Sequence, residues 1–349
     1  AVSLTEDFGL FDTSLYLEKY GESLAGFSKS ADANAYTIEA RLKTDPNDPP
    51  STGISRDIGF SYSRFMHKAS HTKMNIIDVY SKFYFPKLFI GAEFLFPSGK
   101  TQNPNYQTLG GLPACTGSVP GVVNGEETCI SQDISAFGAL LKTKYLLTST
   151  SNDGTIYGIE KSQRMLGTSE RQDSQYMEFW AGYASGGENQ FNNSSTTSTS
   201  TNKISAIRLN ANIQPALLMF DNTLPLINGM PTASITNTTF ARLSYTIESP
   251  SWGQFTSALI TGRLNKLNPI FATCTPTAFD PSSPINNFCT GGNKNLGVEV
   301  DVKYAYTTMD RVTASLESGY WMVGNAWKKY GQSTIRNSFG ARATISTVF

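Results

Sequence analysis

The sequence has few charged residues, few histidines and no long apolar run. Only 16% of its 349 residues are Asp, Glu, Lys or Arg, whereas about a quarter is usual for soluble proteins. The 28 basic and 28 acidic side chains balance, so the basic surplus that binds nucleic-acid phosphates is missing. A transmembrane helix needs about 18 consecutive apolar residues, and runs such as Ala216 to Phe220 are far shorter. The composition therefore excludes a helical membrane protein and argues against a nucleic-acid partner.

The sequence also lacks the motifs of a metal site or an enzyme. His67 and His71 are four residues apart, with no Glu or third ligand between or beside them. The glycine pairs at 110–111 and 186–187 lack the following helix that an anion-binding loop needs, and no nucleophile elbow occurs. An enzyme would have to recruit one of the two histidines. We therefore expect no metal, no cofactor and no enzymatic step.

What is present is alternation of apolar and polar residues with period 2, the pattern of β-strands with one apolar face. From Tyr36 to Lys43, apolar side chains alternate with polar ones that include Glu39 and Arg41. The clearest segment is 296–306, where Glu299, Asp301 and Lys303 fill adjacent positions on the polar face. One interpretation is a soluble β-sandwich with its apolar face inward. The other is a membrane β-barrel, in which the apolar face meets lipid.

Several features favour the barrel. The apolar face mixes large aromatic residues with Ala and Thr. Such a mixture suits contact with lipid, because lipid requires apolar side chains but no close complementary packing. Tyr and Phe, 16 and 21 residues respectively, recur near the ends of the predicted strands, where the two membrane interfaces would lie. We therefore predict an all-β fold with a single closed antiparallel transmembrane barrel of about 14 strands, with 12 or 16 as alternatives.

The end of the chain resembles a known class of protein. Segment 338–349 alternates and ends on Phe349, which is similar to the assembly signal of bacterial outer-membrane β-barrels. Segment 296–326 is similar to the closing strands of alginate-export and porin-like families. The resemblance implies a location in the bacterial outer membrane, short periplasmic turns and long extracellular loops. It also implies contact with outer-membrane lipid and lipopolysaccharide, and with the barrel-assembly machinery during biogenesis.

The expected organisation is an N-terminal segment, 1–34, followed by the barrel, 35–349. The N-terminal segment is either a first strand or a plug in the lumen. Strands are expected over 207–214 and between residues 154 and 165, and residues 165–173 are assigned to the outer side. The polar tract 186–202 falls on the periplasmic side although it is long, which indicates either an unusual loop or a misassigned strand near Pro215.

Four cysteines form two local pairs within the two longest predicted outer loops. Local pairing of Cys115 with Cys129 and of Cys274 with Cys289 is the simplest of three connectivities. Disulfides persist at cell surfaces, and one that closes a loop of about 15 residues contributes on the order of 3 kcal/mol. A four-cysteine zinc site would need closer spacing. We therefore expect disulfides that stiffen the outer loops.

If the apolar face meets lipid, the polar face lines the lumen. The predicted lumen-lining residues are Glu39, Arg41, Lys43, Asp57, Lys142, Lys144, Glu160, Arg208, Arg242, Glu248, Glu299, Asp301, Lys303, Glu317 and Arg342. Their mixed charge predicts a channel for passive diffusion of small polar or charged solutes. The alternatives are a structural or interaction barrel with a closed lumen, whose stiffened loops bind a partner, and an uptake channel for hydrophobic compounds. A homo-oligomer or a complex with another envelope protein is compatible with each of these.

Overall fold

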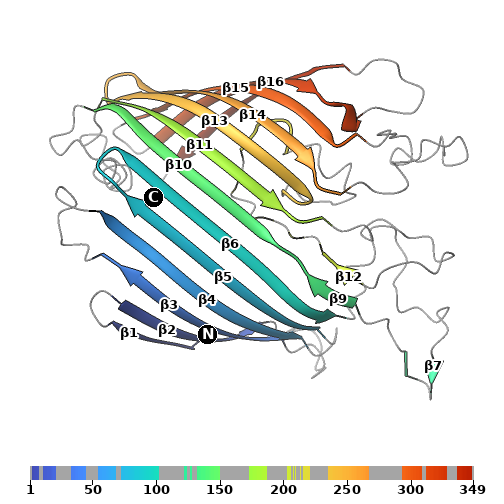
Figure 1. Ribbon diagram of the computed structural model, residues 1–349. Helices are drawn as coiled ribbons and strands as arrows, with labels where there is room; N and C mark the ends of the chain where they lie inside the picture. Colours follow the sequence, from blue (N-terminus) through green and yellow to red (C-terminus); the bar gives the residue numbers. More distant parts are fainter. Residues whose placement is uncertain are drawn as a thin grey trace, which may run out of the picture.

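The computed structural model is an all-β chain whose long strands lie side by side (Figure 1). It describes residues 2–7, 11–20, 33–44, 54–67, 72–101, 122–123, 126–127, 132–149, 173–186, 203–205, 207, 209, 213, 215–220, 235–266, 293–308, 312–327 and 336–347. No helix within these ranges is long and apolar enough to cross a membrane.

Fifteen strands form one sheet. They are β1 (Val2–Asp7), β2 (Phe11–Tyr20), β3 (Ala33–Lys43), β4 (Ser55–His67), β5 (Thr72–Tyr84), β6 (Leu88–Thr101), β9 (Gln132–Ser135), β10 (Gly138–Ser149), β11 (Ser174–Ala184), β12 (Lys203–Ile204), β13 (Thr238–Ser249), β14 (Gly253–Leu264), β15 (Asn295–Thr307), β16 (Val312–Val323) and β17 (Ser338–Thr347). The short strands β7 (Val122–Val123) and β8 (Glu126–Glu127) pair separately, and η7 (Asn325–Trp327) is a 3-10 helix.

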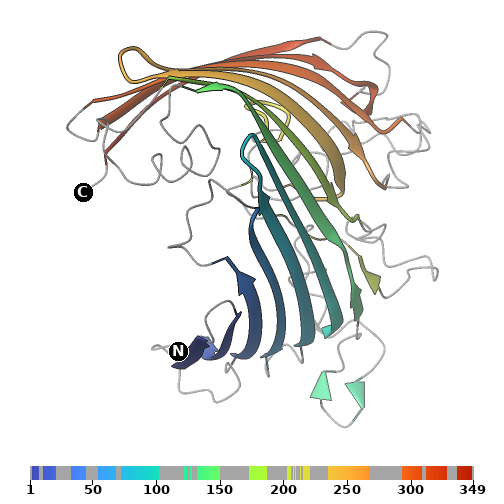
Figure 2. The same ribbon diagram turned by 60° about the vertical axis from the view of Figure 1, so that its left-hand side comes forward.

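The sheet is an antiparallel meander. Pairing runs from β1 through β6, then to β10, β11 and β13, and on through β17. Short β9 pairs with the end of β6, and β12 pairs in parallel with β9. The sheet is strongly curved, and we call the space on its concave side the hollow (Figure 2). In the described part of the chain, β1 and β17 are the two edges of the sheet. The predicted all-β antiparallel fold, with about 14 strands, is confirmed.

The alternation in the sequence separates the two faces of the sheet. We call the face that carries Glu299 and Asp301 the inner face, because it borders the hollow, and the opposite face the outer face. On β15, Glu299 is fully buried while the neighbouring Val300 is 40% exposed. On β14, Ile260 is fully buried while Leu259 is 51% exposed. The solvent-exposed face of the isolated chain is thus the apolar one, the reverse of a soluble sheet.

Residues 2–20, which belong to the N-terminal segment, contribute β1 and β2 to the sheet. The register of β2 aligns Leu15 with Ile38 of β3 and places both on the outer face. Apolar and polar residues alternate from Phe11 to Glu18, and the pattern breaks at Lys19, within the window from residue 15 to 24 where alternation is poor.

The strand predicted over 207–214 is wrong, because β11 pairs directly with β13 along its whole length. Ile207 and Leu209 are buried on the inner side, and their side chains approach the position that a Cβ on Gly138 would take. The backbone amide of Ile207 donates to Ser185 and that of Leu209 to Ile235. Ile207 and Leu209 thus alternate because they pack on the inner face, and they are not part of the apolar outer face.

Two further sequence predictions concern connections between strands. β10 pairs directly with β11, so no strand lies between them in the sheet. The strand ends at Ser149 and Ser174 lie at the same end of the sheet as the short turns 85–87 and 250–252. Residues 150–172 and 187–202 lie outside the described residues, so the sides expected for 165–173 and for the polar tract 186–202 stay predictions.

Candidate functional site

The predicted lumen-lining residues that the structure describes share the inner face of the sheet. The register of neighbouring strands identifies which residues share this face. They are Glu39, Arg41, Lys43, Asp57, Lys142, Lys144, Arg242, Glu248, Glu299, Asp301, Lys303, Glu317 and Arg342. Glu160 and Arg208 lie outside the described residues, as do the four cysteines and Phe349. The disulfides and the role of Phe349 therefore stay predictions, as does the lining of a water-filled passage.

Sequence reasoning missed further charged residues on the same face. They are Asp12, Asp78, Lys82, Glu93 and Glu178. Glu178 lies between Tyr176 and Trp180, two aromatic inner-face residues of β11, and aromatic residues had been expected to face lipid. The sequence did contain a signal for Glu178, because it alternates with the apolar residues Met177 and Phe179, which define the outer face of this strand.

Ion pairs join neighbouring strands across the inner face. Arg41 donates from two guanidinium nitrogens to the two carboxylate oxygens of Asp57, each at 2.7 Å. Lys43 pairs with Asp12 at 2.6 Å. Arg342 and Glu317 are 2.9 Å apart. The Arg41 and Arg342 side chains keep about 40% of their surface exposed. The charges therefore line the hollow and are not sealed within a core.

A different arrangement covers the inner face of β14 to β17. Residues 215–220, which we call the strap, lie across these strands in the connection between β11 and β13. The backbone amides of Leu218 and Met219 donate to the two carboxylate oxygens of Glu299, both at 2.7 Å. The amide of Leu217 donates to Asp301 at 3.1 Å. Both Glu299 oxygens and one Asp301 oxygen thereby pair with backbone donors of an irregular segment. The other Asp301 oxygen, Oδ1, is buried without a hydrogen-bond partner in the described part of the chain.

Glycines on three strands make room for the strap. A Cβ on Gly340 would lie 2.5 Å from Leu218, and one on Gly262 would lie 3.0 Å from Met219. A Cβ on Gly319 would lie 2.5 Å from the Asp301 carboxylate and 3.4 Å from Leu217. These three glycines form a seat for the strap, and the strap residues Met219 and Phe220 belong to an apolar cluster that also includes Phe240, Ile260, Leu296 and Trp321.

A cluster of cations and aromatic rings occupies the inner face of β10, β11 and β13. Lys142, Trp180 and Arg242 are successive register partners. The Lys142 ammonium lies 4.8 Å from the centroid of the Trp180 ring, and the Arg242 guanidinium lies 5.2 Å from the same centroid. Glu178 pairs with Lys142 at 2.7 Å and accepts a 2.6 Å hydrogen bond from the Trp180 indole. Lys144 lies 4.0 Å from the centroid of Tyr176.

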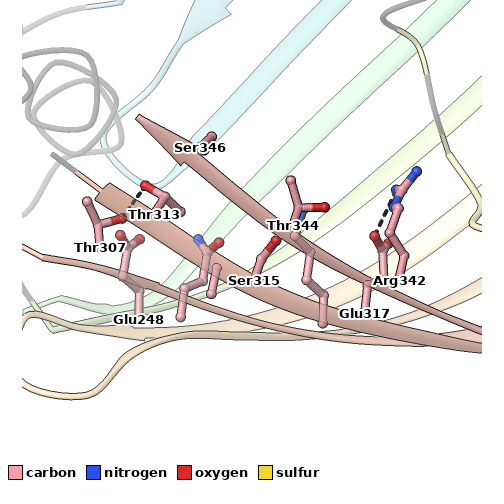
Figure 3. A pocket seen from close by; sticks show the side chains of 11 residues that line it. Glu248, Thr307, Thr313, Ser315, Glu317, Arg342, Thr344 and Ser346 are labelled. Carbon is pink, nitrogen blue, oxygen red and sulfur yellow. Dashed lines mark hydrogen bonds and ion pairs between the residues drawn. The ribbon is translucent and has the colours of Figure 1, made fainter. Parts of the chain in front are cut away.

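A polar cavity of about 580 Å³ opens on the inner face near the ends of β13 to β17. Its walls carry hydroxyl groups and charges of both signs (Figure 3). The lining residues are Glu248, Gln254, Lys303, Ala305, Thr307, Thr313, Ser315, Glu317, Arg342, Thr344 and Ser346. Among the residues that the structure describes, no group of three or more His, Cys, Asp or Glu side chains is placed to hold a metal ion.

The outer face is predominantly apolar, with charged residues such as Arg64 and Arg263 toward the strand ends, where aromatic rings also gather. Phe137 lies within ring-contact distance of Phe94, Phe96 and Tyr183, with centroids 4.9 to 6.5 Å apart, at the end with the long connections. Large apolar side chains are exposed on this face, including Ile38, Phe60, Leu141, Leu243, Tyr304, Leu316 and Ile345. Soluble monomers rarely expose so many large apolar side chains on one face.

The comparisons with known proteins are sparse. No family model matches the chain, and no curated protein is detectably similar to it. One similar solved structure is the crystal structure of BamA from Haemophilus ducreyi lacking POTRA domains 1–3, with 10% sequence identity and a TM-score of 0.28. The alignment covers 99% of this chain and 66% of that chain.

Proposed function

We propose that this chain is an outer-membrane β-barrel through which small polar or charged solutes diffuse passively. One observation carries the proposal: the same strands present an exposed apolar outer face and a charged inner face around a hollow. The proposal includes no enzymatic step, metal or cofactor.

The outer face supports the membrane location. Water would penalise exposure of Leu259 and Leu316, which are 51% and 59% exposed, at about 25 cal/mol per Å² of apolar surface. Lipid removes that penalty, and it requires no close packing of the mixed large and small side chains. Aromatic rings toward the strand ends suit the two interfaces of a bilayer. Outer-membrane lipid and lipopolysaccharide are then the surrounding partners, and the barrel-assembly machinery acts on the chain during biogenesis.

The inner face supports a polar passage. Its ion pairs remain partly exposed, with 38% of the Lys142 side chain accessible. The cavity of about 580 Å³ adds a polar recess at the end with the short turns. Charged groups along a pore wall interact with passing ions and solutes. Closure of the sheet edges β1 and β17, directly or through further residues, completes the passage in this proposal.

A structural or interaction barrel with a closed lumen is the second candidate, and the strap favours it. The strap covers the inner face of β14 to β17, and it reduces the free cross-section of the hollow. A barrel closed in this way would act through its long outer connections, with a homo-oligomer or another envelope protein as partner.

Single-channel conductance of the refolded protein in planar bilayers tests the proposal. We expect steady openings, with an ion preference measurable in a salt gradient. Insertion is verified in parallel by protection of the embedded strands from an added protease. Silence from protein that is demonstrably inserted would contradict the channel and favour the closed barrel.

A further inference from the structure

The cations around Trp180 are fixed in position before any ligand arrives. Glu178 holds the Trp180 indole at 2.6 Å and the Lys142 ammonium at 2.7 Å, and its side chain is only 13% exposed. The indole lies between the neighbouring-strand residues Lys142 and Arg242, whose charged groups are 4.8 and 5.2 Å from its centroid. Cation–π contacts of this kind favour a defined position for each cation. The four side chains therefore form one preorganised unit.

This unit carries a surplus of positive charge. Lys142 and Arg242 contribute two positive charges and Glu178 contributes one negative charge, which leaves the unit a surplus of one. Lys144, the register partner of Glu178, adds a further positive charge beside it. Within the described part of the chain, no carboxylate lies within 4.0 Å of the Arg242 guanidinium, whose contact is the face of Trp180. A guanidinium over a ring still has N–H donors at its edge, and these match the two oxygens of an oxyanion.

The unit lies on the inner face in the same register row as the docked strap. The register row that contains Lys142, Trp180 and Arg242 continues through Ile260 to Glu299, where the strap is docked. Glu299 is fully buried at that end, whereas 38% of the Lys142 side chain remains exposed at the other end. A solute that passes beside the strap therefore meets the cations.

We propose that Arg242 and Lys142, positioned by Trp180 and Glu178, form a binding site for small solutes that carry a carboxylate or phosphate group. The site deepens the proposed function, because it makes the passage one for anionic solutes. Arg242 supplies paired donors to the oxyanion, Lys142 supplies a second positive charge, and Trp180 is a positioning residue.

Titration calorimetry of the refolded protein in detergent micelles at low salt tests the site without relying on conductance. The probes are glutarate, inorganic phosphate and the neutral analogue glutaramide. We expect saturable binding of glutarate, phosphate or both, and none of glutaramide. Binding of glutarate alone identifies organic carboxylates as the ligand class, and binding of phosphate alone identifies phosphate groups. Equal binding of glutaramide, or no binding of either anion, would overturn the proposal.

Substitutions tie the binding to these residues. Arg242→Gln removes charge-assisted hydrogen bonds and should weaken binding at least about tenfold. Arg242→Lys keeps the positive charge but loses the paired N–H donors of the guanidinium, so it should also weaken binding. This variant provides the test if Arg242→Gln does not fold. Arg263→Gln makes the same change on the outer face of β14 and should leave the affinity unchanged. Wild-type affinity in both Arg242 variants would contradict the site.

The anion site and the channel can fail separately. Anion binding in micelles together with silent bilayers would leave the site standing and contradict the diffusion channel. Steady openings without anion binding, and with the same ion preference in wild type and Arg242→Gln, would leave the channel standing and contradict the site.

Discussion

At the scale of single residues, the most informative side chain is Glu299. A carboxylate in the middle of a strand, fully buried, would be costly without partners. Here its two oxygens each accept a backbone amide of the strap at 2.7 Å. Glu299, which the sequence predicts on the polar face of its strand, holds a segment of chain against the inner face.

Glu299→Gln should release the strap while the sheet remains folded. The amide group of Gln places a donor opposite one of the backbone amides, so one hydrogen bond is lost and a buried donor is left unpaired. The cost is about 2 kcal/mol, which corresponds to roughly thirtyfold faster hydrogen exchange at Leu218 and Met219. Exchange followed by mass spectrometry on peptides from the refolded protein measures this change.

Glu317→Gln is the matched control, because Glu317 lies on the same face and pairs with Arg342, away from the strap amides. The strap amides should exchange in this variant as slowly as in the wild type. Equal exchange rates in Glu299→Gln and wild type would mean that the carboxylate does not hold the strap.

The glycine seat gives a second prediction at this scale. In Gly319→Val, the new Cβ would lie 2.5 Å from the Asp301 carboxylate and 3.2 Å from that of Glu299. Displacing both carboxylates should lower stability by about 1–3 kcal/mol, seen as a lower thermal midpoint in micelles. Ser318→Val adds the same side chain on the outer face, where Ser318 pairs with Val302, and should have little effect. Equal midpoints for the two variants would count against the seat.

At the scale of elements, most strands could be predicted from period-2 alternation, because one face of each is apolar and the other polar. The prediction failed at segment 207–214, where Ile207 and Leu209 also alternate. Their partners are Gly138 and the backbone of Ser185 and Ile235, and nothing in a local pattern identifies such partners. The alternation correctly assigned Arg242 and Glu299 to the same face. It could not reveal that the strap covers Glu299 or that the Trp180 ring lies between two cations, because both contacts join residues far apart in the sequence.

The two faces of one strand should respond oppositely to a charge. Leu259 and Thr256 lie three residues apart on β14, on the outer and inner faces respectively. Leu259→Arg places a charge where lipid is expected, at a cost of about 2–4 kcal/mol near the bilayer midplane, whereas Thr256→Arg extends toward the hollow. We expect a clearly lower yield of folded protein for the first variant in vesicles, measured by gel mobility without heating. Equal yields would argue that the outer face does not contact lipid.

At the scale of the whole molecule, the sheet has its apolar residues on the side that an isolated chain exposes. Phe60, Leu243, Leu259, Val300 and Leu316 are all between 40% and 59% exposed. A soluble β-sandwich built from these strands would have to bury this face against a second sheet, yet the strands form one sheet that curves with this face outward (Figure 2).

The chain should therefore fold only when an amphiphile covers its outer face. Diluted from denaturant into detergent micelles or phosphatidylcholine vesicles, it should give a β-type circular dichroism spectrum and a band whose gel mobility changes on heating. Diluted into buffer alone, it should aggregate, because a continuous exposed apolar face drives association. A monodisperse monomer in buffer with the same spectrum would contradict the membrane barrel and restore the sandwich. Since this outcome depends on the outer face alone, it tests the membrane location whether or not the lumen conducts.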